Sequence, residues 1–363
     1  MLRAGLIGLP STGKSTLFHL LTRGPTGGDS GKPGKFGKAD ASIGVASVPD
    51  ERLDRLTALF EPKKHVRATV NFADVAGGQS AHSLVDLAAF READALLHIV
   101  RAFEAPDIPH VAETIDPARD VQTVEDELIL ADLAVAEKRL ERIARDRRKG
   151  IAKHVEQEAE LLERCRARLE EGQAIRGLEF DPTAKKTLNG FQFLSAKPLL
   201  LVLNVDETGI RDPEGAVQAA HLGELLEQPN TLAMAVCAEM ELEIAELDAE
   251  DAEVFLADLG LDEPGLNRVA RAAYRLLGYI SFFTVGKDEC RAWSIPAGTP
   301  ARSAAGEIHS DIERGFIRAE VVHCDPLLER GSQAACRDHG EVRLEGKEYE
   351  IRDGDVINFR FAT

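Results

Sequence analysis

The eight residues from 8 to 15 constrain the fold of this chain more than any other stretch. They read Gly-Leu-Pro-Ser-Thr-Gly-Lys-Ser, which fits the pattern GxxxxGK[ST]. The apolar run Leu2–Ile7 before them is typical of a buried strand, and Lys14–Thr22 after them has a helical pattern. Glycine lets backbone amides turn inward around a phosphate, because no Cβ stands in the way. This strand–loop–helix unit predicts a nucleotide site in an α/β fold.

The phosphates of ATP or GTP are expected to lie in this loop. Lys14 can reach the β- and γ-phosphate oxygens and is therefore a candidate catalytic residue. The hydroxyl of Ser15 is placed to ligate Mg²⁺, and the helix that begins near Lys14 adds its positive N-terminal end. The nucleotide contacts expected from this segment are Gly8, Pro10, Ser11, Thr12, Gly13, Lys14, Ser15 and Thr16.

A second motif, Asp-Val-Ala-Gly at 74–77, ends the strand-like run Ala68–Ala73. An Asp at the carboxyl end of a neighbouring strand can hold Mg²⁺, and a Gly amide can contact the γ-phosphate. The pattern DxxG is common by itself. It indicates a nucleotide site here because it lies about sixty residues after the loop, at the end of a strand-like run. We expect Asp74 to be a metal ligand and Gly77 a nucleotide contact, with a strand-end cap as the alternative for Asp74.

A third motif, Asn-Val-Asp-Glu at 204–207, follows the strand-like run Pro198–Leu203. Guanine-specific proteins have NKxD at this place, and its Asp accepts hydrogens from guanine N1 and N2. Here the Lys is absent and the last carboxylate, Glu207, is one methylene longer. We therefore expect weakened guanine specificity, with a turn that makes no base contact as the alternative. The expected base contacts are Asn204, Val205, Cys237 and Ala238.

Strands alternate with helices in the first hundred residues, which indicates a doubly wound parallel sheet. Ala95–Val100 and, later, Leu232–Val236 read as further strands, and Ser83–Arg91 reads as a helix. The segment Gly24–Gly37 is dense in Gly, Pro, Lys and Ser, which predicts a mobile loop. After about residue 277 short strand-like runs at 291–295, 348–351 and 356–361 predict a separate small β-rich domain.

A helical segment interrupts this pattern from about Val121 to about Gly172. It is charged, rich in Ala, Leu, Glu and Arg, and free of Pro, and Gly150 divides it into two amphipathic runs. An antiparallel hairpin or short coiled coil is predicted. The apolar positions are Leu133, Ala136, Leu140 and Ile143, then Val155, Ala159, Leu162 and Leu169. Its bend is basic, since residues 138–149 hold seven Lys or Arg and two acids.

Charge and composition exclude several classes of protein. The net charge of −18 argues against indiscriminate nucleic-acid binding but allows a local basic patch. Residues 239–263 carry eleven acids and no Lys or Arg, which predicts a strongly negative surface. No run reaches 18 apolar residues, and the N-terminus lacks the pattern of a signal peptide. Five scattered cysteines without a CxxC pair favour reduced thiols in the cytoplasm and no zinc site.

Taken together, the motifs resemble those of the YchF family of Obg-like ATPases. The similar runs are GLPSTGKSTLF, DVAG, NVDE, Cys-Ala-Glu at 237–239 and the segments 263–269, 285–296, 307–319 and 353–359. The resemblance covers nearly the whole chain and implies a Ras-like P-loop domain, a coiled-coil insertion and a C-terminal β-grasp (TGS) domain. We expect the P-loop domain in two parts, 1–120 and 195–278, the helical insertion at 121–194 and the TGS-like domain at 279–363.

The resemblance also implies a function, namely slow Mg²⁺-dependent hydrolysis of ATP, with GTP as the alternative, on a ribosome-binding protein. His110 matches a family His proposed to act in catalysis, and a structural or surface histidine is the alternative. Ribosomal RNA would contact the TGS-like domain and the basic bend through phosphate groups. The bend residues expected to do so are Arg142, Arg145, Arg147, Arg148 and Lys149, and a solvated hairpin tip is the alternative.

Three departures from the family pattern concern hydrolysis. Ser11 stands where the family has an Asn linked to potassium-assisted hydrolysis, and Lys38 stands where it has a magnesium-binding switch Thr. The switch after DVAG is shortened to residues 78–82, where Gln79 and His82 are candidates to orient water. The runner-up function is therefore a nucleotide-dependent ribosome-binding or RNA-binding module with little hydrolysis. A third is a scaffold that uses the acidic face of residues 239–263.

Overall fold

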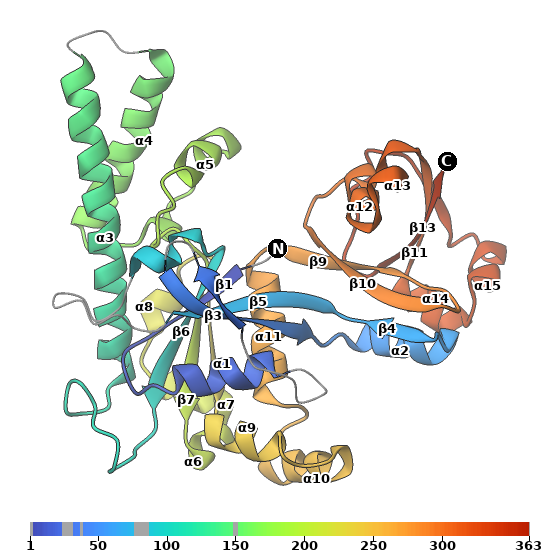
Figure 1. Ribbon diagram of the computed structural model, residues 1–363, viewed down its shortest axis with the longest axis horizontal. Coiled ribbons are helices and arrows are strands. Elements are labelled where there is room, and N and C mark those ends of the chain that lie inside the picture. Colours follow the sequence, from blue (N-terminus) through green and yellow to red (C-terminus); the bar gives the residue numbers. More distant parts are fainter. Residues whose placement is uncertain (1–2, 24–31, 37–38, 76–86, 148–151, 363) are drawn as a thin grey trace. The chain divides into compact units, whose positions relative to one another are not determined.

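The computed structural model describes residues 3–23, 32–36, 39–75, 87–147 and 152–362 (Figure 1). Two compact units are present: unit 1 contains residues 1–46 and 71–276, and unit 2 contains residues 47–70 and 277–363. The sequence motifs gave no sign that residues 47–70 pack with the C-terminal segment. The finer division at 120, 194 and 278 stays a prediction.

Unit 1 is built on a seven-stranded sheet with the order β2-β3-β5-β1-β6-β7-β8. β1 pairs in parallel with β5 and β6, and the parallel pairing continues through β7 to β8. Strands covered on both faces need continuous apolar runs, and all seven residues of β7 are buried. The strands are β1 (Arg3–Ile7), β2 (Lys32–Phe36), β3 (Ala39–Val48), β5 (Ala68–Val75), β6 (Ala95–Ala102), β7 (Leu199–Val205) and β8 (Thr231–Val236).

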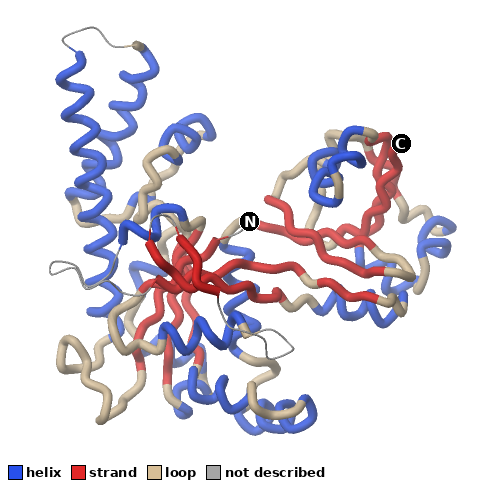
Figure 2. The backbone as a smooth tube through the Cα atoms, in the orientation of Figure 1, coloured by secondary structure: helices blue, strands red, loops and turns tan. Residues whose placement is uncertain are grey.

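The helices of unit 1 either flank this sheet or, like the hairpin of α3 and α4, project away from it, as Figure 2 shows. They are α1 (Lys14–Thr22), the 3-10 helix η1 (Leu87–Glu92), α3 (Pro117–Asp146), α4 (Lys153–Glu170), the 3-10 helix η3 (Ile175–Gly177), α5 (Pro182–Asn189), α6 (Glu207–Ile210), α7 (Pro213–Ala219), α8 (Gly223–Leu226), α9 (Ala238–Ile244), α10 (Ala249–Leu259) and α11 (Gly265–Leu276). The predicted helix at 14–22 and the predicted strands around the motifs are confirmed. None of the helices among the described residues is both long enough and apolar enough to cross a membrane.

The helical insertion forms the predicted hairpin of α3 and α4, which lie side by side (Figure 1). α3 begins at Pro117, and the side chain of Asp116 caps it by accepting the Arg119 amide at 3.1 Å. Apolar side chains at helical spacing fill the seam: Ile129, Ala136, Ile143, Ala159, Leu162, Cys165 and Leu169. Leu133, Leu140 and Val155 pack against this cluster and are partly buried.

A buried carboxylate ties α3 to the segment that leads into β7. Asp132 is fully buried and accepts hydrogen bonds from the Leu194 amide at 3.0 Å, the Ser195 amide at 2.7 Å and the Ser195 hydroxyl at 2.8 Å. Arg91 of η1 lies 3.3 Å from the same carboxylate. Burial raises the pKa of Asp132, while these donors and the Arg91 charge oppose the rise.

Unit 2 contains a six-stranded sheet with the order β12-β11-β13-β9-β10-β4. Its elements are α2 (Glu51–Phe60), β4 (Lys64–Val66), β9 (Tyr279–Thr284), β10 (Glu289–Pro296), α12 (Ala301–Ile308), α13 (Ser310–Arg314), β11 (Phe316–His323), α14 (Cys324–Arg330), α15 (Gln333–Asp338), β12 (Arg343–Glu345) and β13 (Asp355–Phe361). α12 packs on β10 and β11 over an apolar core that includes Phe282, Ile295 and Ile357.

Residues 47–70 contribute a helix and an edge strand to this unit. α2 packs on β10 and α14 with Leu53 and Leu56 fully buried, and β4 pairs in parallel with β10. Arg52 on α2 forms an ion pair with Asp353 at 2.7 Å and lies over the ring of Phe283, 5.3 Å from its centroid. An N-terminal segment therefore completes the C-terminal sheet.

Two expectations about secondary structure are wrong within the described residues. Lys32–Phe36, expected to be part of a mobile loop, forms β2, because antiparallel pairing with β3 supplies the backbone partners that composition alone does not reveal. Residues 348–351 form no strand but only a bridge between Pro300 and Glu350. The Tyr349 amide instead donates to the Gly346 carbonyl in a turn. The described part of the predicted helix at 83–91 is the 3-10 helix η1.

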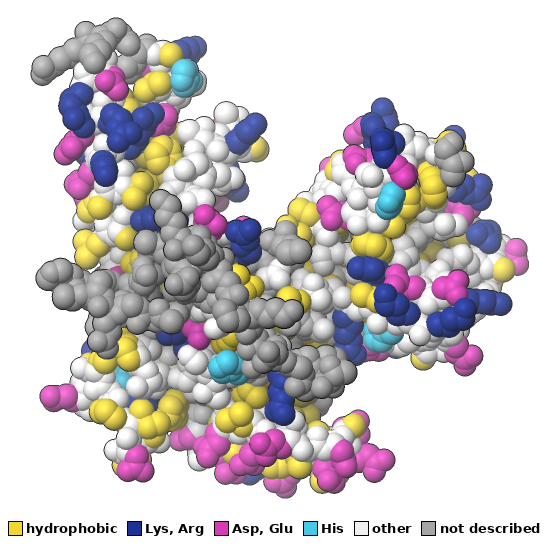
Figure 3. All heavy atoms as spheres, in the orientation of Figure 1, with side chains coloured by type: hydrophobic (Ala, Val, Ile, Leu, Met, Phe, Trp, Pro, Cys, Tyr) yellow, Lys and Arg dark blue, Asp and Glu magenta, His cyan; other side chains and the backbone are white. Residues whose placement is uncertain are grey.

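The acidic surface predicted for residues 239–263 is present on α9 and α10, where acidic side chains gather (Figure 3). Glu241 is an exception, because it is buried and accepts the Gly265 amide at 2.6 Å at the start of α11.

Candidate nucleotide site

The loop between β1 and α1 has the left-handed backbone that its glycines allow. Gly8 has φ 151°, Gly13 has φ 87° and Ser11 between them has φ 62°. A Cβ at Gly8 would lie 2.4 Å from the Ile99 carbonyl oxygen, and one at Gly13 would lie 2.4 Å from Nδ2 of Asn204. The two glycines therefore bring the loop against the carboxyl ends of β6 and β7.

The other predicted loop contacts lie around this turn. Thr12 is buried, and its hydroxyl donates to the Leu9 carbonyl at 3.1 Å, which stabilises the loop. Pro10 and Ser11 are exposed, and Lys14 is the first residue of α1. The N-cap residue of this helix is Gly13, which has no side chain to cap it, so the N-terminal amides of α1 are suited to binding an anion.

The predicted metal ligands lie together at this end of the sheet. The Ser15 hydroxyl donates to Oδ2 of Asp74 at 2.9 Å, which joins α1 to the carboxyl end of β5. The other carboxylate oxygen, Oδ1, is buried and has no hydrogen-bond partner among the described residues. A buried acceptor without a donor is costly, and a hydroxyl beside a carboxylate is a donor set that Mg²⁺ prefers. These residues fit the metal.

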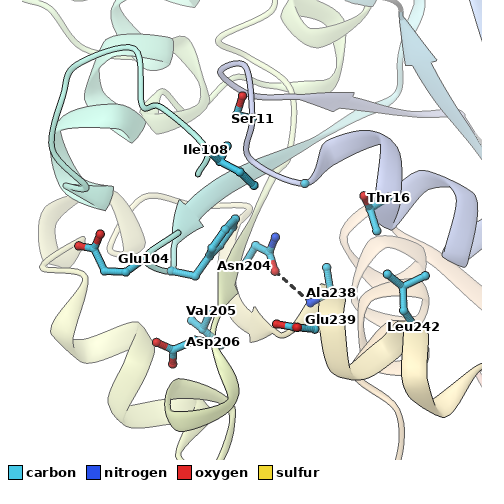
Figure 4. A pocket seen from close by; sticks show the side chains of 12 residues that line it. Ser11, Thr16, Glu104, Ile108, Asn204, Val205, Asp206, Ala238, Glu239 and Leu242 are labelled. Carbon is cyan, nitrogen blue, oxygen red and sulfur yellow. Dashed lines mark hydrogen bonds between the residues drawn. The ribbon is translucent and has the colours of Figure 1, made fainter. Parts of the chain in front are cut away.

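A cavity of about 420 Å³ opens beside the loop (Figure 4). Its walls come from the loop, from α1 and from the segments that follow β6, β7 and β8. In open α/β sheets, ligands bind in this position outside the carboxyl ends of the strands. The lining residues are Ser11, Gly13, Thr16, Phe103, Glu104, Ile108, Asn204, Val205, Asp206, Ala238, Glu239 and Leu242.

Asn204 holds two walls of this cavity together. Its Nδ2 donates to the Thr12 carbonyl at 3.0 Å, and its Oδ1 accepts the Ala238 amide at 3.0 Å (Figure 4). Each end of the carboxamide is therefore engaged with backbone. The structure gives Asn204 a positioning role, and its predicted contact with the base stays a prediction.

The carboxylates of the NVDE motif point to different partners. Asp206 lines the cavity and caps α6 by accepting the Gly209 amide at 2.9 Å. Glu207 is not among the lining residues, and its Oε1 forms an ion pair with Nη2 of Arg211 at 2.8 Å. Because Glu207 lies outside the cavity lining, its carboxylate is not placed to present the acceptor that NKxD offers to guanine.

Cys237 and Ala238 follow β8. Cys237 is buried beneath the cavity wall, and burial raises the pKa of its thiol against the opposing amides of Met240 and Glu239. Ala238 itself lines the cavity. Of this pair, only Ala238 is in position to meet a ligand in the cavity.

His110 is buried beside a carboxylate, and its predicted catalytic role stays a prediction. Its side chain is 2% exposed, and its Nε2 lies 2.8 Å from Oδ2 of Asp120. Its Nδ1 accepts the Ala112 amide at 3.1 Å. Nδ1 therefore has a hydrogen-bond partner, whereas Nε2 lies beside the Asp120 carboxylate without a hydrogen bond among the described residues, and His110 does not line the cavity.

Several predicted residues lie outside the described residues. They are Lys38, Gly77, Gln79, His82, Arg148 and Lys149. At the basic bend, the described residues Arg142, Arg145 and Arg147 are exposed, whereas Arg139 is held by Glu158 of α4.

The sequence motifs missed part of the cavity wall. Phe103, Glu104 and Ile108 follow β6, and Leu242 lies on α9. They belong to no recognised pattern. Their position after the carboxyl end of a strand next to the loop was the only signal that could have revealed them.

Known proteins are similar across nearly all of this chain. A family model, YchF-GTPase_C, described as "Protein of unknown function (DUF933)", matches residues 279–362. The "Ribosome-binding ATPase YchF" of Bacillus subtilis (strain 168) is 41% identical over 370 residues, covering 99% of each chain. The protein of the same name from Escherichia coli O157:H7 is 37% identical over 365 residues with the same coverage. The solved structure of the Schizosaccharomyces pombe YchF GTPase matches with a TM-score of 0.84 and 28% identity, covering 99% of this chain and 97% of the other.

Proposed function

The chain belongs to the YchF family of P-loop nucleoside triphosphatases, as its motifs indicated, and from this premise we propose that it binds Mg²⁺ and ATP beside residues 8–16 and hydrolyses the ATP slowly. One observation carries the proposal. The Ser15 hydroxyl and the Asp74 carboxylate meet at 2.9 Å beside a glycine-bounded loop, and no residue that the structure describes donates to the buried second oxygen of this carboxylate.

Each residue has a distinct role in this proposal. The loop amides and the N-terminus of α1 bind the phosphates, and Lys14 balances the charge of the γ-phosphate. Ser15 and Asp74 hold Mg²⁺, which when bound neutralises charge on the β- and γ-phosphates. Gly77 is proposed to contact the γ-phosphate through its amide.

ATP is the proposed substrate in preference to GTP. The cavity has apolar walls at Phe103, Ile108 and Leu242, and the carboxamide of Asn204 forms a polar part of its lining. Because Glu207 lies outside the cavity lining and pairs with Arg211, its carboxylate is not placed to accept hydrogens from guanine N1 and N2. A purine that needs no such acceptor is therefore favoured, and GTP is the alternative.

A second candidate function is a nucleotide-dependent ribosome-binding module with little hydrolysis. The placement of His110 favours it, because this side chain is buried beside Asp120 and does not line the cavity. Single-turnover release of phosphate from Mg·ATP, with and without ribosomes, separates the two functions. A rate above that of uncatalysed hydrolysis supports the enzyme. A rate equal to the uncatalysed one, with ATP still bound, supports the module.

The chain is proposed to associate with ribosomes in the cytoplasm. Two of its relatives carry ribosome binding in their names, and the exposed Arg142, Arg145 and Arg147 supply cations for RNA phosphates. The TGS-like domain at 279–363 is proposed as a second contact. The five free, buried cysteines suit a reducing compartment.

A further inference from the structure

A buried arginine outside every motif lies at the carboxyl end of β6, close to the nucleotide cavity. Arg101 is 2% exposed, and no carboxylate in the described part of the chain forms an ion pair with it. Burying an unpaired charge costs several kcal/mol unless hydrogen bonds compensate. Packing alone would favour an apolar residue here, so the guanidinium needs another explanation.

The guanidinium bonds to the backbone of a single loop. Nε donates to the Phe103 carbonyl at 3.2 Å, Nη1 to the Ile108 carbonyl at 3.0 Å and Nη2 to the Ala105 carbonyl at 3.3 Å. Its Cζ also lies 4.7 Å from the centroid of the Phe103 ring, within the range of a cation–π contact. One planar group with a fixed fork of donors therefore fixes three points of the loop.

This loop forms one wall of the cavity. Phe103, Glu104 and Ile108 line it. Ile108 is 42% exposed, so its own burial contributes little to holding the wall in place. The phosphate end of the site is built from other parts, namely the loop before α1 and Asp74 on β5.

We propose that Arg101 is a positioning residue that fixes the 103–108 wall and thereby sets the affinity of the site for the nucleoside part of the nucleotide. The inference rests on the proposed function, because it concerns the same cavity. It predicts that loss of the guanidinium weakens contacts to base and ribose and leaves contacts to phosphate intact.

The test compares two ligands on the full chain. Dissociation constants for Mg·ATP and for inorganic tripolyphosphate with Mg²⁺ are measured by calorimetry on the parent, Arg101→Lys and Arg101→Met. We expect both variants to lose ATP affinity about tenfold, which corresponds to about 1.4 kcal/mol, with tripolyphosphate affinity unchanged. Lysine does not rescue, because a point charge does not reproduce a planar fork over three carbonyls. Single-turnover hydrolysis at saturating ATP should stay at the parent rate.

Arg176→Lys is the matched control. Arg176 is a buried arginine of the same unit that pairs with Glu125 and donates to the Lys197 carbonyl, and it does not line the cavity. Its variant should leave the ratio of the two dissociation constants unchanged. A folding defect lowers the binding stoichiometry for both ligands without changing that ratio, so an unchanged ratio in Arg101→Lys overturns the inference. Failure of the parent itself to bind ATP would instead overturn the proposed function.

Discussion

Asp74 has an arrangement that lowers the stability of the fold and that binding of a metal ion would compensate. One carboxylate oxygen accepts the Ser15 hydroxyl, while the other is buried without a donor among the described residues. A protein optimised only for stability would pair that oxygen or expose it. Gly13 is also required by the site, because a side chain there would clash with Asn204 and separate the loop from β7.

Asp74→Asn should remove most of the benefit that Mg²⁺ gives to ATP binding. The neutral amide is a weaker ligand for a hard cation, so we expect ATP affinity in Mg²⁺ to fall about tenfold. In EDTA the affinity should be unchanged or higher, since a negative charge near the phosphates is gone. Titrations with labelled ATP in both buffers measure this, with the exposed Asp258→Asn as control. An undiminished response to Mg²⁺ would remove Asp74 from the metal site.

His98 on β6 should make the protein sensitive to acid. Burial, assisted by the nearby Arg176 charge, lowers its pKa from 6.5 to about 3. Between pH 6.5 and pH 3 this imidazole is therefore protonated in the unfolded chain and neutral in the folded chain. The contribution of neutral His98 to the free energy of unfolding is complete above pH 6.5 and is lost as the pH falls toward 3. For this one group the folding equilibrium falls up to tenfold for each pH unit. Urea unfolding of the parent and of His98→Gln from pH 7 to pH 4.5 should show a shallower decline in the variant. Parallel declines would contradict this.

The sequence predicted those helices and strands whose formation depends on short-range patterns of apolar residues. The strands at 3–7, 95–102 and 199–205 and the helices of the hairpin were visible because apolar runs and helical spacing reflect burial on both faces or on one. β2 was not predicted, because Pro33 and Gly34 disfavour a strand and the strand forms only through its pairing with β3. The cavity wall at 103–108 was missed for a related reason, since Arg101 holds it from a position that no motif marks.

Asp132→Ala should destabilise the base of the helical hairpin. The change leaves two buried amides and the Ser195 hydroxyl without their acceptor and removes the carboxylate that pairs with Arg91. Breaking a buried charged network of this kind costs about 3–5 kcal/mol. Chemical denaturation followed by circular dichroism measures the loss. Asp126→Ala, at an exposed position of the same helix, should stay within about 0.5 kcal/mol of the parent. Equal effects of the two changes would show that the buried network contributes nothing.

Across the full chain, the motifs identified the family and the α/β fold with its helical insertion and C-terminal domain, and both are confirmed. The sequence did not reveal that residues 47–70 belong to unit 2. Such a contribution depends on long-range packing, with Leu53 and Leu56 buried in that unit and β4 pairing with β10. Local sequence patterns do not predict this packing, because the sequence of α2 is that of an ordinary amphipathic helix and does not indicate its partner.

Ribosome binding should depend on the charge of the hairpin tip. Changing Arg142, Arg145 and Arg147 together to Gln should weaken sedimentation with ribosomes and reduce the slope of log affinity against log salt by about 2 to 3. The control changes Arg166, Lys185 and Lys186 to Gln, which removes equal charge from α4 and α5. A salt slope that stays at the parent value in the tip variant would assign the contact elsewhere.

Equilibrium titration of the full chain with Mg·ATP, beside Lys14→Ala, tests whether the loop before α1 binds the nucleotide. The parent should bind one ATP per chain. The variant should bind about a hundredfold more weakly, because a charge-assisted bond to phosphate worth about 3 kcal/mol is lost. Equal affinity of parent and variant would mean that the nucleotide does not bind in the loop before α1.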